Sequence, residues 1–89
     1  MLPMKKPAKY KHKDIIFTAH ALQRIQERNL THMKSLEFFY LAKPMKYFPK
    51  QYATLLKMKD YIYIANITKT EVKIVTCYKL DPEYYKNHV

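Results

Sequence analysis

Cysteine is almost absent from this sequence. Cys77 is the single thiol among 89 residues, so no disulfide can form within the chain. One cysteine also gives none of the paired spacings by which zinc sites are recognised. We therefore expect neither a disulfide nor a metal site, and we expect a reducing, intracellular setting.

Long hydrophobic runs are missing as well. No apolar segment approaches the roughly 20 residues that a membrane-spanning helix needs. The N-terminal stretch MLPMKKPAKYKHK also lacks the apolar segment of a signal peptide. The sequence thus predicts a cytoplasmic protein with no membrane partner.

Acidic residues are scarce relative to basic ones. The chain has 17 Lys and Arg against 7 Asp and Glu, which gives a net charge of +10. A field of this sign on so small a body attracts polyanions, and nucleic acid, RNA in particular, is the expected partner. Part of the basicity can instead reflect the nucleotide bias of the genome, because the chain is also rich in Ile and Tyr.

The chain has neither Gly nor Trp, and it contains no internal repeat. Its length is that of one small domain. Residues 1–13 combine prolines with several lysines and predict a flexible basic arm. Residues 14–80 are expected to form a single α+β domain, and residues 81–89 a polar and aromatic tail.

Two helices are expected in the first half of the domain. Thr18 is a suitable N-cap for a helix that ends near Arg28, and Asn29 can adopt the left-handed conformation that usually falls to Gly after a helix. Thr31 is expected to cap a second helix that extends to about Lys43. The short connection between them predicts an antiparallel helical hairpin.

The second half reads as a series of strands. Short turns join these strands, which favours an antiparallel meander. In the first half, Asp14–Phe17 is either an edge strand or a lead into the first helix. Strict alternation predicts that Val72, Ile74, Thr76 and Tyr78 share one face of the last strand and Lys73, Val75, Cys77 and Lys79 the other. The fold class predicted is α+β, with an N-terminal helical hairpin packed on a three- to four-stranded antiparallel sheet. Its strands are expected at Met45–Phe48, Tyr52–Met58, Tyr61–Ile67 and Val72–Leu80.

The first helix carries the motif HAxxRxxxR, which is formed by His20, Ala21, Arg24 and Arg28. With the preceding FT step and the late IVTCY segment, the chain resembles domain-of-unknown-function family 4258, from about Ile15 to Tyr78. That family is allied to the RelE, ParE and BrnT toxins. The resemblance implies a RelE-like fold, a metal-independent endoribonuclease activity, and an acidic antitoxin-like protein as a partner. The chain departs from the family at Asn29, where Gly is common.

Cleavage of RNA without a metal needs a general base, a general acid and fixed cations around the phosphate. His20 can transfer protons near neutral pH, and arginines one and two helical turns further on can hold phosphate oxygens. No cofactor is required. The candidate catalytic residues are His20, Arg24, Arg28 and Tyr78, and the candidate substrate-binding residues are Thr76, Lys79 and Lys73.

Three other interpretations remain open from the sequence. Arg24 can pair with Glu27, and Arg28 with Glu37 or Asp60, in which case the motif is architectural. The protein can also be a noncatalytic nucleic-acid-binding module, with sheet tyrosines that stack on bases. A third hypothesis is a protein-interaction domain that binds a partner strand at an exposed sheet edge.

Overall fold

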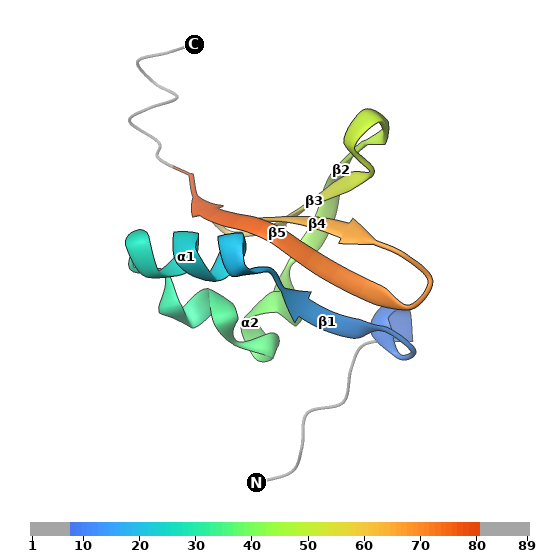
Figure 1. The fold of residues 1–89 in the computed structure, drawn as a ribbon, viewed down its shortest axis with the longest axis horizontal. Coiled ribbons are helices and arrows are strands. Elements are labelled where there is room, and N and C mark those ends of the chain that lie inside the picture. The colour runs from blue at the N-terminus through green and yellow to red at the C-terminus, as the bar shows by residue number, and fades with distance from the viewer. Residues whose placement is uncertain (1–7, 81–89) are drawn as a thin grey trace, which may run out of the picture.

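The computed structural model describes residues 8–80, which form a five-stranded mixed sheet with two short helices on one face (Figure 1). The strands are β1 (Asp14–Phe17), β2 (Lys43–Phe48), β3 (Ala53–Met58), β4 (Tyr61–Ile67) and β5 (Glu71–Lys79). The helices are α1 (Ala19–Glu27) and α2 (Leu36–Leu41). Three 3₁₀ turns complete the described chain: η1 (Ala8–Tyr10), η2 (Thr31–Lys34) and η3 (Pro49–Gln51). None of the helices in residues 8–80 is long and apolar enough to span a membrane.

The sheet order is β1-β5-β4-β3-β2, and this order corrects the predicted fold class. Strands β2 to β5 form the expected antiparallel meander. However, β1 adds to β5 in parallel, with Ile15 opposite Val72 and Phe17 opposite Ile74, so the sheet is mixed and has five strands. The prediction of a helical hairpin on an antiparallel sheet was therefore wrong. Asp14–Phe17 is an edge strand, one of the two alternatives that the sequence left open, but its parallel pairing with a strand so distant in sequence leaves no local signal.

Helix α1 begins and ends as its sequence predicts. The Thr18 side chain accepts a hydrogen bond from the backbone N–H of Ala21 at 3.1 Å. At the other end Asn29 has φ 57°, and the backbone N–H of Leu30 donates to the carbonyl of Ile25 at 2.8 Å. The bond from Leu30 to Ile25 is that of a Schellman motif at the C-terminus of the helix. Asn29 takes the left-handed place in this motif that Gly usually fills.

The second predicted helix is broken into η2 and α2. Ser35, rather than Thr31, caps the α-helical part, with its hydroxyl accepting from the N–H of Phe38 at 3.4 Å. The carbonyl of Met33, which would accept an intrahelical bond in a continuous helix, instead accepts from the buried hydroxyl of Tyr63 at 2.9 Å. The two short segments thus bend around a core side chain, and α2 ends before Lys43.

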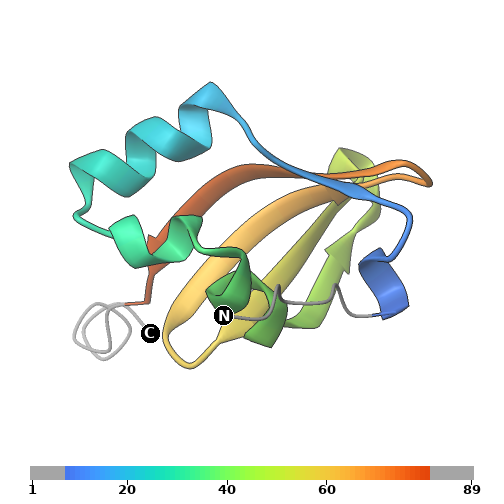
Figure 2. The same cartoon turned by 90° about the horizontal axis from the view of Figure 1, so that it is seen from below.

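The core lies between the helices and one face of the sheet, and both ribbon views place α1 and α2 on that face (Figure 2). Tyr10 also belongs to this core: it is 2% exposed, and its ring packs 5.3 Å from that of Phe39. The predicted basic arm therefore includes a core residue, whereas its first seven residues and the predicted tail, 81–89, lie outside the described residues. The fully buried side chains with the largest volumes are Tyr63, Phe39, Ile25, Met33 and Leu56.

Replacement of Tyr63 by Phe tests the buried hydrogen bond that bends the η2–α2 segment. We expect Tyr63→Phe to lower the free energy of unfolding by about 1 kcal/mol, because the carbonyl of Met33 loses its donor in a site closed to water. Urea denaturation measures the change. Tyr47→Phe, at a 55% exposed tyrosine, is the matched control and should change stability little. An equal effect of both substitutions would contradict the assignment.

Candidate nucleic-acid interface

The polar flank of α1 is held by contacts within the helix. Arg24 Nη1 lies 2.8 Å from Glu27 Oε2, and the Gln23 side-chain amide donates to the other oxygen of Glu27 at 2.9 Å. The bond from Gln23, followed by that from Arg24, lowers the pKa of the Glu27 carboxyl. His20 is exposed near the start of the helix. The ion-pair interpretation of Arg24 is thus the arrangement found.

Arg28 bonds to the sheet backbone. Its Nη1 donates to the carbonyl oxygen of Cys77 in β5 at 2.9 Å. Neither Glu37 nor Asp60 forms an ion pair with it in the described part of the chain, so the carboxylate pairing considered from the sequence is not the one found. The guanidinium fastens the end of α1 to the outer edge of β5.

A β-bulge changes the faces of β5. The register with β4 shifts between Ile64 and Ala65, which pair with Thr76 and Ile74, so Val75 is an extra residue. Cys77 therefore joins Ile74 in the core, and Thr76 takes the opposite face. The strict alternation predicted for this strand was wrong beyond the bulge.

The bulge also separates the predicted site residues. Lys73, Thr76 and Tyr78 lie on the sheet face away from the helices, whereas α1 with His20 lies on the other. Lys79 is on the helix side, with its Nζ 5.8 Å from the centre of the Tyr61 ring. Lys73 pairs with Glu71 at 3.6 Å. The proposed catalytic and substrate-binding residues are not gathered in one cleft.

A different group of residues comes together on the face away from the helices, which we call the outer sheet face. Its middle consists of half-buried or buried apolar and aromatic side chains, and no helix of the described residues packs on it. Lysines of β2 and β3 border this middle on one side. The face comprises Lys43, Lys46, Phe48, Ala53, Leu55, Lys57, Ile62, Ile64, Asn66, Lys73, Thr76 and Tyr78.

Lys43 and Lys57 are directly opposite each other in the β2–β3 pairing. Side chains in such positions start about 5 Å apart, and like charges there are destabilising. Neither lysine has an ion-pair partner among residues 8–80. Next to them, the Nζ of Lys46 lies 5.2 Å from the centre of the Phe48 ring. This corner of the sheet is thus cationic and aromatic, and no carboxylate of the described part of the chain forms an ion pair with it.

Sequence reasoning missed this group, although a signal for it exists. From Phe38 to Lys59 the chain has five lysines and no acidic residue. Only the strand pairing shows that three of these lysines share one face.

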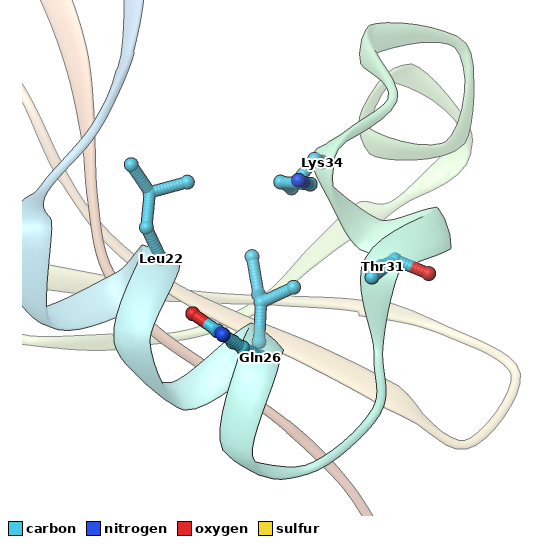
Figure 3. Close-up of a pocket in the computed structure, with 5 residues that line it drawn as sticks. Leu22, Gln26, Thr31 and Lys34 are labelled. Atoms are coloured by element: carbon cyan, nitrogen blue, oxygen red, sulfur yellow. The ribbon is translucent and has the colours of Figure 1, made fainter.

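A separate hollow of about 380 Å³ lies between α1 and η2 (Figure 3). Leu22 and Lys34 stand on its opposite walls, and Ile25, Gln26 and Thr31 complete the lining. It contains none of the predicted site residues. Within residues 8–80, no three His, Cys, Asp or Glu side chains are grouped so as to hold a metal ion.

Comparison with models of known families, with curated proteins and with solved structures found no match to this chain. The resemblance to domain-of-unknown-function family 4258 therefore stays a prediction.

The bond between Arg28 and the Cys77 carbonyl can be tested by stability. We expect Arg28→Met to lower the free energy of unfolding by about 1 kcal/mol or more, because a partly buried, charge-assisted bond is lost. Arg24→Gln is the control, since its exposed pair with Glu27 contributes about 0.5 kcal/mol or less. Urea denaturation of each variant gives the two changes in the free energy of unfolding. If the two variants lose the same stability, Arg28 has no special role at the β5 edge.

The Cys77 thiol gives a pH dependence. Burial raises its pKa to about 12, against a partly compensating effect of Arg28. Above about pH 9 the unfolded chain loses this proton while the folded chain keeps it, so stability falls as pH rises, by up to about 1.4 kcal/mol per pH unit. Unfolding free energies measured between about pH 9 and about pH 11 should fall less steeply for Cys77→Ala. Equal slopes would show that the thiol does not remain protonated in the fold.

Proposed function

We propose that this protein is a noncatalytic nucleic-acid-binding module that uses the outer sheet face. The observation that carries the proposal is the lysine corner at Lys43, Lys46 and Lys57 beside an apolar middle, where residues 8–80 form no ion pair. Phosphates supply negative charge to these lysines. The proposal assigns the protein to the cytoplasm, where RNA is abundant.

The Lys43–Lys57 pair favours an anionic ligand over a structural role. Two ammonium groups on directly opposite strand positions repel each other, and a phosphate between them converts this repulsion into two attractions. Three other cations in the described chain have structural contacts: Arg24 with Glu27, Arg28 with the β5 backbone, and Lys73 with Glu71. What distinguishes the β2–β3 corner is that two of its lysines are directly opposite each other on neighbouring strands.

The apolar middle of the outer sheet face favours nucleic acid over small anions. Half-buried side chains such as Leu55 and Ile64 form a floor next to the lysines. A nucleotide chain presents phosphates and flat base surfaces side by side, and this floor can cover the bases while the lysines neutralise the phosphates. A purely ionic ligand would leave the floor exposed to water.

Ribonuclease activity is not part of this proposal. The sheet lies between His20 and the predicted partners Thr76 and Tyr78, and Arg24 is engaged by Glu27. A general base and a hydrogen-bonding partner on opposite faces cannot act on one phosphate. Cleavage, and the toxin function that the family resemblance implies, stay as predictions from the sequence.

Charge removal at the lysine pair should affect binding and stability in opposite directions. We expect Lys57→Gln to weaken binding of a fluorescently labelled RNA and to reduce the slope of log affinity against log salt by about 0.7. The same substitution should raise the free energy of unfolding by a few tenths of a kcal/mol, about the cost of a like-charge pair. Fluorescence anisotropy at several salt concentrations and urea denaturation provide the two readouts.

Lys34→Gln is the matched control, because it removes one positive charge from the helix side of the sheet. It should leave the salt slope nearly unchanged. Equal loss of affinity in both variants would mean that net charge, and not the outer sheet face, determines binding. Affinity that does not respond to salt in the native protein would defeat the proposal.

A further inference from the structure

The turn between β2 and β3 presents one tyrosine to solvent. Tyr52 is 74% exposed, the highest value among the exposed large hydrophobic residues. It follows η3, in which Lys50 is exposed as well. Figures 1 and 2 place this turn on the far side of the molecule from α1. Tyr52 therefore lies at the turn end of the β2–β3 hairpin, toward Lys46 and Phe48, whereas the Lys43–Lys57 pair lies at the other end of the same hairpin.

The backbone of Tyr52 is left-handed, with φ 50° and ψ 38°. This conformation is disfavoured for a bulky residue and is usually occupied by Gly, Asn or Asp. The chain uses Asn29 at its helix C-terminus, so a residue suited to this conformation is available to it. Lys59, with φ 54°, is a second large residue in this conformation. Tyr52 differs from it in presenting an aromatic ring that is 74% exposed, so packing does not account for the ring.

We propose that Tyr52 stacks on an unpaired base, and that the ligand of the outer sheet face is single-stranded nucleic acid. This inference rests on the proposed function. Every base has a flat surface that an exposed tyrosine ring can cover, whereas the bases of a duplex are stacked on each other and closed to such contact. Lys50 beside the ring and Lys46 at the Phe48 ring supply cations for the adjacent phosphates.

Charge favours a nucleic acid over a protein at this turn. Apolar side chains near it, such as Met45 at 62% exposed and Tyr47 at 55%, would also suit a protein partner. However, every charged residue of the segment from Phe38 to Lys59, which contains this turn, is a lysine. In addition, Pro44 and the register shift beside it interrupt the free edge of β2, which disfavours the addition of a partner strand.

The experiment compares the full chain with its Tyr52→Asn and Tyr52→Phe variants. The probes are a labelled single-stranded oligouridine and an RNA duplex of equal length, followed by anisotropy. We expect the native protein to prefer the single strand, Tyr52→Asn to bind it more weakly by on the order of tenfold, and Tyr52→Phe to bind like the native protein. Binding to the duplex should be the same for all three.

Thermal unfolding separates this role from a structural one. Because Asn tolerates the left-handed conformation, Tyr52→Asn should unfold at the same temperature as the native protein or higher, while its affinity falls. Tyr47→Thr, which removes another exposed ring from the helix side of the same hairpin, should leave the preference for single strands unchanged.

The outcomes distinguish the two proposals. Native-like binding of the single strand by Tyr52→Asn, or equal affinity of the native protein for single strand and duplex, would overturn the inference and leave the proposed function standing. Failure of the native protein to bind either probe would overturn both. Loss of affinity accompanied by a lower unfolding temperature in Tyr52→Asn would also count against stacking, because the ring would then be a structural element.

Discussion

The fold depends on how α1 is fastened to the outer edge of β5. Strand β1 covers only the first part of that edge, and Thr18 continues where it stops, with its N–H donating to the Ile74 carbonyl and its hydroxyl to that of Val75. One helix length later, Arg28 donates to the Cys77 carbonyl. The second part of the β5 edge would otherwise expose its backbone carbonyls, and α1 covers it. This covering protects β5 from pairing with strands of other chains. The arginines that suggest catalysis in the sequence are thus largely occupied in building the fold.

Local signals in the sequence predicted the elements well, whereas pairing between distant segments could not be predicted. The Thr18 cap and the left-handed Asn29 follow from the chemistry of single residues and were confirmed. The parallel contact of β1 with β5 depends on the whole topology, and so does the hydrogen bond from Tyr63 that bends η2 away from α2. The bulge at Val75 had the largest consequence, because one extra residue moves every later side chain of the strand to the other face.

The same limit explains why the interface proposed from the structure differs from the site predicted from the sequence. Sequence reasoning sought functional residues on α1, where charged side chains have a regular spacing, but a regular spacing is also what intrahelical ion pairs require. Lys43 and Lys57 have no such periodicity and become neighbours only through the β2–β3 pairing. The lack of acidic residues around them was visible in the sequence, but without the register it does not distinguish a binding face from a solvated one.

Two unfavourable features are concentrated in one hairpin, and the rest of the fold explains how they are tolerated. The hairpin carries the opposed lysines and the left-handed tyrosine, while most of the core, from Ile25 to Cys77, lies on the other side of the sheet. The opposed lysines lie on the sheet face that the core does not occupy, at the open end of the hairpin, and Tyr52 lies in the exposed turn at its other end. Most of the stability comes from core residues on the helix side, so repulsion and strain at these two places cost little of the total. The separation of the helix-covered face from the lysine-bordered face thus lets a chain this small fold around one face while the other carries uncompensated charge.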